Sequence, residues 1–307
     1  MSEIYDVIIL GAGPAGLAAG LYAGRSRLNV LIIEKGQDGG QIAITDEIEN
    51  YPGQIVEGES GPSLIARMTE QAEKFGAKRV SDMIKEVELE GEVKVLKSEK
   101  NEYRGKNVVI ATGAHARPIG CKGEGQFRGK GVSYCATCDG AFFRNKVTAV
   151  VGGGNVALED AIFLSRMCKK VYLIHRRDEF RGAKILQDEV KKNDKIEILW
   201  NTIVTKIDGD EVVERLHIQD VDNHVDKLLD VDGIFIAVGT KPASELLSGK
   251  LSTDEKGYII AGEDGVTNIP GIFAAGDGRS KNLRQVVTAV SDGANCVYSV
   301  ERYLQNA

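Results

Sequence analysis

Two stretches of the chain repeat one pattern of apolar strand, glycine-rich turn, helix and second apolar strand. The first stretch contains, in order, Val7–Leu10, Gly11–Gly16, Leu17–Arg25 and Val30–Glu34. The second contains Val147–Val151, Gly152–Ala157, Leu158–Met167 and Val171–His175. Apolar strands that alternate with helices are typical of parallel α/β sheets. The near-repeat therefore predicts an α/β fold with two Rossmann-like dinucleotide-binding domains.

Two later apolar runs mark where the chain is expected to cross between these domains. Val108–Ile110 ends in an Ala-Thr-Gly turn, Ile234–Ile236 ends in an Ala-Val-Gly turn, and Pro118 and Pro242 follow shortly after them. Glycine and proline cluster at such boundaries because the periodic pattern stops there. We expect a discontinuous first dinucleotide-binding domain at 1–116 and 244–307, with the second dinucleotide-binding domain inserted at 117–243. The C-terminal part should add a strand within 271–277 and an amphipathic helix from about 283 to 303.

The first glycine-rich turn has the features of a pyrophosphate site. Glycine lets the backbone approach a phosphate closely, and the free N–H groups and the dipole at a helix N-terminus attract negative charge. Glu34 ends the next strand, where a carboxylate accepts hydrogen bonds from ribose hydroxyls. We assign to this nucleotide the turn residues Gly11, Gly13, Pro14, Ala15 and Gly16, together with Glu34, Thr112 and Gly113.

The second turn differs at the position that selects the nucleotide. His175 stands as far beyond Gly152 as Glu34 stands beyond Gly11, and Arg176 and Arg177 follow it directly. Arginines bind a ribose 2′-phosphate that a carboxylate would repel, so this site should prefer NADPH. Its expected residues are Gly152, Gly154, Asn155, Ala157, His175, Arg176, Arg177 and Arg181, the last placed one helical turn further on. The alternative is a solvated basic helix start.

Cys135 and Cys138 form the one closely spaced pair among the five cysteines of the chain. A C-x-x-C pair in an α/β protein predicts a redox dithiol. The competing zinc site would need a second close Cys/His pair, which the sequence lacks. Asp139 follows the second cysteine, and two interpretations of it stay open. Its carboxyl group exchanges a proton with a thiolate, or it is only a helix cap or solvated turn residue. Cys121, Cys168 and Cys296 are expected to be small buried side chains.

Composition narrows the class of protein. The net charge of −6 is spread along 307 residues without a Lys/Arg block, which argues against nucleic acid as a partner. The N-terminus leads straight into a strand pattern, and no apolar run approaches the roughly 18 residues of a membrane span. The widely spaced cysteines do not resemble a secreted disulfide framework. We expect a cytoplasmic protein with no membrane segment and no metal.

The chain resembles the low-molecular-weight thioredoxin reductases over essentially its whole length. The resemblance rests on Cys135–Gly140, Gly152–Ala157, His175–Arg181, Gly11–Gly16, Glu34, Gly39–Gln41, Glu49–Asn50, Gly276–Asp277 and Arg284–Gln285. It implies FAD and NADPH as cofactors, thioredoxin as partner and a homodimer. It adds Gly40, Gln41, Asn50, Gly276, Asp277, Arg284 and Gln285 to the FAD site, with Asp277 at the ribityl or pyrophosphate end and Gln285 near the flavin.

The resemblance also gives each residue of the redox motif a role. Cys138 would face the flavin, Cys135 would attack thioredoxin, and Asp139 would serve as acid and base. Because the dithiol and the flavin belong to different domains, we expect the domains to rotate during turnover. Two alternatives stay open: a reductase of the same fold that serves another small disulfide carrier, peroxiredoxin-linked or glutaredoxin-like, and a flavin or nucleotide redox sensor without turnover.

Overall fold

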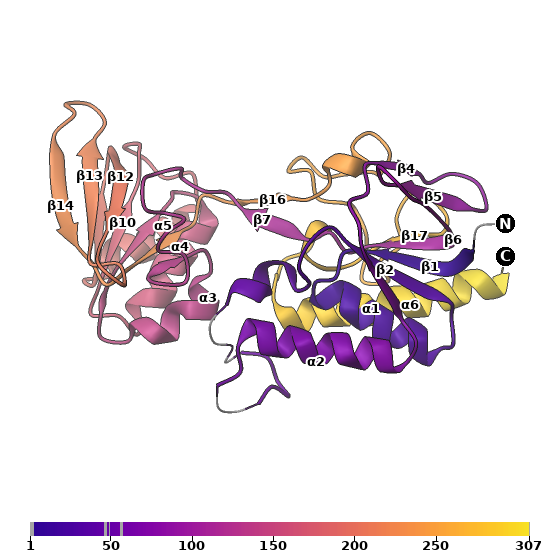
Figure 1. Ribbon diagram of the computed structural model, residues 1–307. Coiled ribbons are helices and arrows are strands. Elements are labelled where there is room, and N and C mark those ends of the chain that lie inside the picture. Colours follow the sequence, from indigo (N-terminus) through magenta and orange to yellow (C-terminus); the bar gives the residue numbers. More distant parts are fainter. Residues whose placement is uncertain (1–2, 46–47, 49, 56–57, 307) are drawn as a thin grey trace. The chain divides into compact units, whose positions relative to one another are not determined.

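The chain divides into two compact units in the computed structural model (Figure 1), which describes residues 3–45, 48, 50–55 and 58–306. Unit 1 combines Met1–His115 with Lys241–Ala307, and unit 2 is Ala116–Thr240. Unit 2 is therefore inserted into the sequence of unit 1.

Unit 1 is built on a sheet with the strand order β3-β2-β1-β6, in which each neighbouring pair is parallel. β17 pairs in parallel with the C-terminal half of β6, and β5 pairs antiparallel with its N-terminal half and continues the sheet to β4. The strands are β1 (Ile4–Leu10), β2 (Val30–Glu34), β3 (Lys78–Ser81), β4 (Glu86–Glu88), β5 (Lys94–Lys97), β6 (Glu102–Ile110) and β17 (Ile272–Ala274). The helices are α1 (Pro14–Arg25), α2 (Gly61–Lys74) and α6 (Val286–Asn306), with 3-10 turns η1 (Gly40–Ile44), η3 (Glu245–Leu247) and η4 (Gly276–Gly278).

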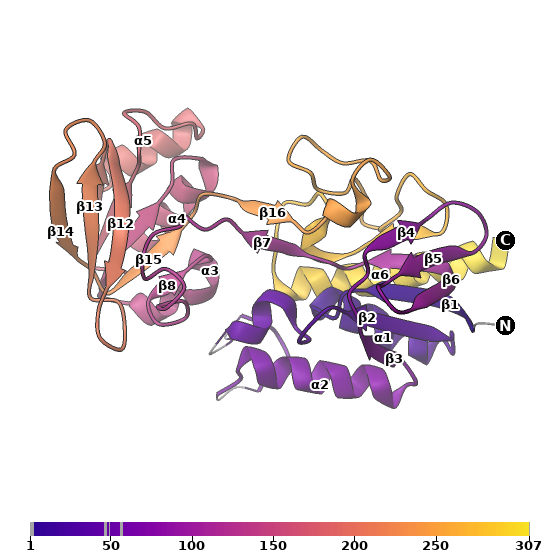
Figure 2. The same cartoon turned by 45° about the horizontal axis from the view of Figure 1, so that its top comes forward.

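Alternate residues of the central strands fill two separate cores in unit 1. Val7 and Ile9 of β1 pack with residues of α1, α2 and α6, which lie together on one face of the sheet (Figure 2). Ile8 and Leu10 point to the opposite face and pack with residues of β4, β5 and the segment after residue 245. A strand buried on both faces is a continuous apolar run, because neither set of alternating positions meets water. This explains why the sequence pattern identified β1 and β2.

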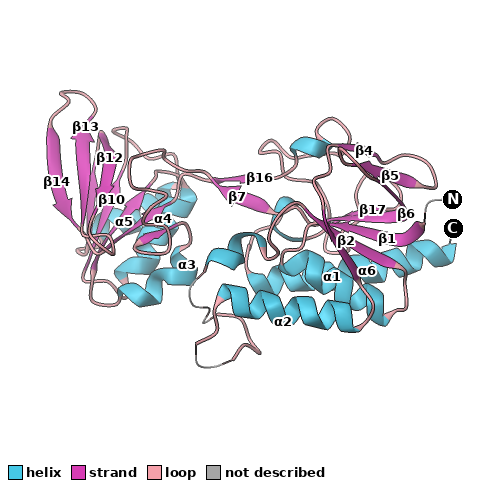
Figure 3. Ribbon diagram, viewed as in Figure 1, coloured by secondary structure: helices cyan, strands magenta, loops and turns pink. Residues whose placement is uncertain are grey.

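Unit 2 has a parallel sheet with the order β11-β10-β9-β15-β8. Its strands are β8 (Val132–Ser133), β9 (Val147–Val151), β10 (Lys170–Ile174), β11 (Ile196–Leu199) and β15 (Gly233–Ile236). The helices are α3 (Ala136–Asp139), α4 (Asn155–Ser165) and α5 (Lys184–Lys192), with the 3-10 turn η2 (Gly140–Phe143). A separate antiparallel sheet contains β12 (Thr202–Asp208), β13 (Arg215–Asp220) and β14 (Asp226–Asp230) (Figure 3).

The two sheets of unit 2 share a core. Val150 and Leu173 face α4 and α5, and Ala149 and Ile174 face residues of β12 and β13. The parallel sheet is thus covered by helices on one face and by the antiparallel sheet on the other. The two chain crossings, β7 (Ala114–Ala116) and β16 (Thr240–Pro242), pair with each other as a short sheet.

The structure confirms the α/β fold class with parallel sheets of the Rossmann type, and it corrects several details of the expected elements. β2 and β9 have the expected bounds, whereas α1 and α4 each begin three residues earlier than expected, directly at the glycine-rich turn. The placement of Arg181 one helical turn beyond the arginine pair was wrong. Residues 175–183 form no helix, because the backbone N–H groups of Arg181 and Gly182 donate to Gly153 O at 2.8 and 3.2 Å, and α5 begins only at Lys184. In the described part of the chain, no helix is long and apolar enough to cross a membrane.

Candidate functional site

The glycines of the first turn have two different structural roles. A Cβ on Gly11 would lie 2.4 Å from Ala111 O, and one on Gly16 would lie 1.9 Å from Gly11 O, so neither position accepts a side chain. At Gly13 the nearest atom, Gly39 O, is 4.0 Å away. The outer glycines thus pack β1, β6 and α1 together, and the middle glycine leaves open space at the N-terminus of α1. This is the arrangement in which a backbone can approach a phosphate group.

Glu34 ends β2 beside this turn. Its carboxylate accepts hydrogen bonds from Ala12 N at 2.8 Å and from Gly36 N at 3.2 Å. Two backbone donors therefore fix the carboxylate next to the turn. A carboxylate has about four lone-pair sites, so acceptor capacity remains for hydroxyl groups of a ligand.

Asp277 lies in the η4 turn that follows β17. Its Oδ1 atom is buried and has no hydrogen-bond partner among the described residues, and burial raises the pKa of this carboxyl group. Buried polar atoms in folded proteins almost always have a partner. An orphaned acceptor beside the glycine turn fits a ligand hydroxyl at this position.

Sequence reasoning missed the residue that fixes the Asp277 segment. Asp292, on the buried face of α6, accepts a bidentate pair from Arg279 at 2.8 and 2.7 Å, and one bond each from Lys281 Nζ at 2.8 Å and Gly276 N at 2.9 Å. Burial alone would raise the pKa of Asp292, but the bonds from Arg279 and Lys281 hold it below the usual range. The sequence signal that identifies Asp292 is its spacing. It stands three residues after Ala289 and four before Cys296, on a helix face that is otherwise apolar.

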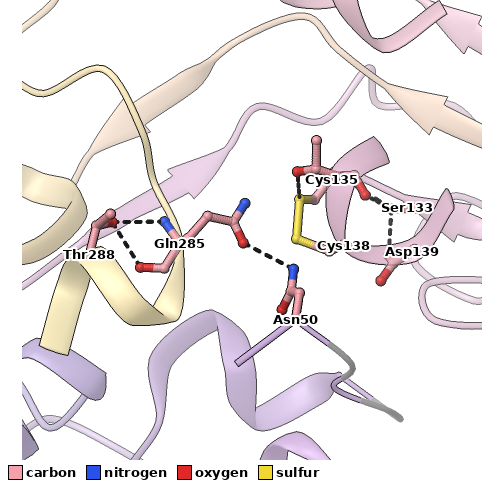
Figure 4. The surroundings of a disulfide bond; sticks show 8 residues. Asn50, Ser133, Cys135, Cys138, Asp139, Gln285 and Thr288 are labelled. Carbon is pink, nitrogen blue, oxygen red and sulfur yellow. Dashed lines mark hydrogen bonds between the residues drawn. A yellow bond between two sulfur atoms is a disulfide. The ribbon is translucent and has the colours of Figure 1, made fainter. Parts of the chain in front are cut away.

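The remaining candidates for the first nucleotide make contacts within unit 1. Gln41 donates to Ala114 O at 2.5 Å, and Asn50 donates to the side-chain oxygen of Gln285 at 3.1 Å (Figure 4). The guanidinium of Arg284 lies 4.1 Å from the ring centre of Tyr258. Glu49, the neighbour of Asn50 in the matched motif, lies outside the described residues.

Four further candidates lie in turns of unit 1. Thr112 donates from its hydroxyl to Ala243 O at 2.7 Å and thereby ties the end of β6 to the segment after β16. Gly40, Gly113 and Gly276 have φ values of 57°, 71° and 76°, which favour glycine. A Cβ on Gly276 would also lie 2.9 Å from the Cβ of Ala15.

The second turn repeats the packing pattern in unit 2. A Cβ on Gly152 would lie 2.5 Å from Ala237 O, whereas no atom lies within 4 Å of one on Gly154. Ala157 replaces the third glycine and is fully buried. Asn155 begins α4, and its side-chain oxygen accepts from Ala183 N at 2.8 Å. The middle position of the turn is again open, as a phosphate site requires.

The structure separates His175 from the arginines that follow it. The His175 ring is buried under the turn, where it would overlap a Cβ on Gly153 at 2.2 Å, and its Nε2 lies 3.0 Å from Glu179 O. Burial lowers the pKa of His175, and the nearby arginines lower it further, so the ring is neutral near pH 7. Arg176, Arg177 and Arg181 are all exposed. The exposed cationic surface beside this turn therefore comes from the arginines.

The sulfur atoms of Cys135 and Cys138 are bonded to each other (Figure 4). Cys135 is the N-cap residue of the short helix α3, and its carbonyl accepts from Cys138 N at 3.3 Å and Asp139 N at 3.1 Å. The Asp139 carboxylate accepts from the Ser133 hydroxyl at 2.6 Å. Asp139 is the last residue of α3 and also the N-cap residue of the 3-10 turn η2 that follows, where its side chain makes no capping hydrogen bond.

Two of the other three cysteines have the expected surroundings. Cys168 and Cys296 are buried, whereas Cys121 is only partly buried. Burial raises the pKa of Cys121 to about 11 and that of Cys296 to about 12, so both thiols stay protonated near neutral pH. Within the described ranges we find no group of three or more His, Cys, Asp or Glu side chains that could hold a metal ion.

Comparisons with known proteins show the family of the chain. Residues 5–293 match the family model for pyridine nucleotide-disulphide oxidoreductases. The chain is 46% identical over 311 aligned positions to a thioredoxin reductase of Peptoclostridium acidaminophilum, with 99% of this chain and 98% of the relative covered. The chain belongs to the thioredoxin reductase family of pyridine nucleotide-disulphide oxidoreductases. A thioredoxin reductase of Listeria innocua is 45% identical, with 99% and 95% covered.

Solved structures give the same result. The crystal structure of thioredoxin reductase from Streptococcus pyogenes superposes with a TM-score of 0.94 at 44% sequence identity, covering 99% of each chain. These matches confirm the resemblance found in the sequence, the Rossmann-type fold and an oxidoreductase function. A flavin and a pyridine nucleotide are the cofactors that membership of this family implies.

Proposed function

We propose that the protein is a thioredoxin-disulfide reductase that uses FAD and NADPH. The observation that carries the proposal is the Cys135–Cys138 disulfide, which lies in the same unit as a glycine turn flanked by exposed arginines. A redox-active pair next to a site suited to NADPH has little use outside electron transfer to a disulfide. The family membership supports the same reaction.

Unit 1 is proposed to bind FAD. The open position at Gly13 suits the pyrophosphate, Glu34 suits ribose hydroxyls, and the orphaned Oδ1 of Asp277 suits a hydroxyl of the ribityl chain. The proposed contact residues are Gly11, Gly13, Pro14, Ala15, Gly16, Glu34, Gly40, Gln41, Asn50, Thr112, Gly113, Gly276, Asp277, Arg284 and Gln285.

Unit 2 is proposed to bind NADPH. Arg176, Arg177 and Arg181 provide the exposed cations for the ribose 2′-phosphate, and the open position at Gly154 suits the pyrophosphate. The proposed contact residues also include Gly152, Asn155 and Ala157 of the turn, and His175, whose buried ring supports Gly153.

When bound, the cofactors supply a hydride from the nicotinamide and carry the electron pair to the internal disulfide. Reduction opens the disulfide to the thiols of Cys135 and Cys138. The Cys135 thiolate then attacks oxidised thioredoxin, and Cys138 attacks the resulting mixed disulfide to reform the internal bond. Asp139 takes the proton of the Cys138 thiol and gives it to the thiolate that leaves on thioredoxin.

Turnover of NADPH against oxidised thioredoxin tests the proposal. Cys135→Ser and Cys138→Ser should each abolish thioredoxin reduction while FAD stays bound, and Cys138→Ser should trap a mixed disulfide through Cys135. Turnover with glutaredoxin-like or peroxiredoxin-linked proteins but not with thioredoxin would favour a reductase of another carrier. Flavin reduction by NADPH without turnover on any carrier would indicate a redox sensor.

The family resemblance also leads us to propose a homodimer in the cytoplasm. Light scattering on the FAD-loaded protein measures the first point, and a mass of one chain would contradict it. Cell fractionation tests the second.

A further inference from the structure

Ser133 is a buried residue beside the redox pair that no sequence motif singled out. It ends strand β8 and stands opposite Phe235 of β15 in the parallel sheet of unit 2. Only 5% of its surface is exposed. The strand pairing and the burial hold its hydroxyl group in one place, next to the start of the Cys135–Asp139 segment.

The hydrogen bonds of this hydroxyl have a defined direction. Ser133 Oγ accepts the backbone N–H of Cys135 at 3.1 Å. Its own proton has two acceptors in range, Asp139 Oδ2 at 2.6 Å and Cys135 O at 3.3 Å. A separation of 2.6 Å is typical of an O–H donor to a carboxylate, and 3.3 Å is long for any O–H bond. The proton therefore goes to Asp139.

We propose that Ser133 is a positioning residue for dithiol–disulfide exchange, because its hydroxyl holds the Asp139 carboxylate in the orientation that exchanges protons with the cysteine pair. The chain of bonds runs from Cys135 N through Ser133 Oγ to Asp139 Oδ2 (Figure 4). One rigid hydroxyl on a sheet strand thus fixes both the first cysteine and the acid. The inference rests on the proposed function and on the proposed role of Asp139 in it.

The exchange conserves sulfur–sulfur bonds, electrons and protons. The Cys135 thiolate forms a bond to one thioredoxin sulfur as the thioredoxin disulfide breaks, and the leaving sulfur takes a proton. The Cys138 thiolate then forms a bond to the Cys135 sulfur, and the second thioredoxin sulfur leaves and takes a proton. The internal dithiol loses two electrons and two protons, and thioredoxin gains them. Each proton moves between sulfurs that are a few ångström apart, so the orientation of the carrier carboxylate affects the rate.

The test compares Ser133→Ala with Ser133→Thr, which keeps a hydroxyl and suits a strand. Losing a hydrogen bond to a charged group should lower kcat for thioredoxin about tenfold in Ser133→Ala, with KM for thioredoxin unchanged. Ser133→Thr should keep most of the wild-type kcat. Ser165→Ala is the matched control, because Ser165 is also 5% exposed and hydrogen-bonded in unit 2, on helix α4.

A second arm separates positioning of Asp139 from support of the fold. Reduction of ferricyanide by NADPH uses the flavin and not the dithiol, so Ser133→Ala should leave it unchanged. In an Asp139→Asn background, Ser133→Ala should cause no further loss of kcat, because the group that it positions is already neutral.

The outcomes distinguish the two levels of the argument. Three results would overturn the inference and leave the proposed function intact. In the first, Ser133→Ala keeps the wild-type kcat while Asp139→Asn is slow. In the others, Ser133→Thr loses kcat as fully as Ser133→Ala, or Ser133→Ala lowers kcat by the same factor in the Asp139→Asn background as in the wild type. No thioredoxin reduction by the wild-type protein would instead overturn the proposed function.

Discussion

The buried ion cluster around Asp292 gives a prediction whose size follows from the structure. The Asp292→Asn variant removes the negative charge that pairs with Arg279 and Lys281 and that also accepts Gly276 N. The side chains of Asp292, Arg279 and Lys281 are only 5%, 11% and 7% exposed, so water cannot replace the lost partner. Removing one partner of a buried pair costs about 3 to 5 kcal/mol, because it leaves an uncompensated buried charge.

Two measurements check this prediction. The free energy of unfolding of the FAD-free protein, measured with urea, should fall by about 3 to 5 kcal/mol in Asp292→Asn. Flavin fluorescence should show weaker retention of FAD, because the segment that carries Asp277 loses its anchor on α6.

An exposed pair provides the control. Lys241 and Glu245 form an ion pair at 2.7 Å with side chains that are 61% and 64% exposed. Glu245→Gln should change the free energy of unfolding by less than about 1 kcal/mol. If Asp292→Asn cost no more than Glu245→Gln, or lost stability without any change in FAD retention, the anchoring role assigned to Asp292 would be wrong.

Three further predictions concern the nucleotide turns and one thiol. Replacing Arg176 and Arg177 by alanine should weaken NADPH binding about tenfold or more and leave NADH binding nearly unchanged, and titration with both nucleotides measures the difference. Gly13→Ala should lower FAD affinity in a folded protein, whereas Gly11→Ala should reduce thermal stability. Only the Cβ added at Gly11 would collide with backbone, because it lies 2.4 Å from Ala111 O. Since burial raises the pKa of Cys121 to about 11, its thiolate is scarce below that pH, and iodoacetamide at pH 8 should leave Cys121 unmodified in the folded protein.

The elements predicted best from the sequence are those whose signal lies in consecutive residues. β2 and β9 are short runs of apolar, mostly β-branched residues buried on both faces, and each has the predicted bounds. The two glycine turns are equally local. The prediction of a helical turn after β10 failed, because the backbone there donates hydrogen bonds to Gly153, more than twenty residues earlier. No periodic pattern in the sequence records such a contact.

The candidate site shows the same limit. Counting positions from the glycine turn placed His175 where Glu34 stands, yet the two side chains differ in the structure. Glu34 accepts two backbone N–H bonds beside the turn, and the His175 ring lies buried beneath it against Gly153. Equivalent sequence positions predict equivalent backbone positions, while burial and partners decide what each side chain does there. Asp292 was missed for this reason, since its partners at Gly276 and Arg279 lie in a segment that only the fold brings to α6.

The two turns also differ in how tightly their helices are held, which bears on what each unit binds. A Cβ on Gly16 would lie 1.9 Å from Gly11 O, whereas the equivalent Ala157 fits in unit 2. In unit 1, α6 also crosses α1 so closely that a Cβ on Gly293 would lie 2.2 Å from Ala15 O. The N-terminus of α1 is therefore fixed both by the strand before it and by the helix that carries Asp292. The two segments of unit 1 that are proposed to contact the nucleotide, the Gly11–Gly16 turn and the Asp277 segment, are thereby anchored to one helix, which suits the proposed role of a cofactor that stays bound through many turnovers.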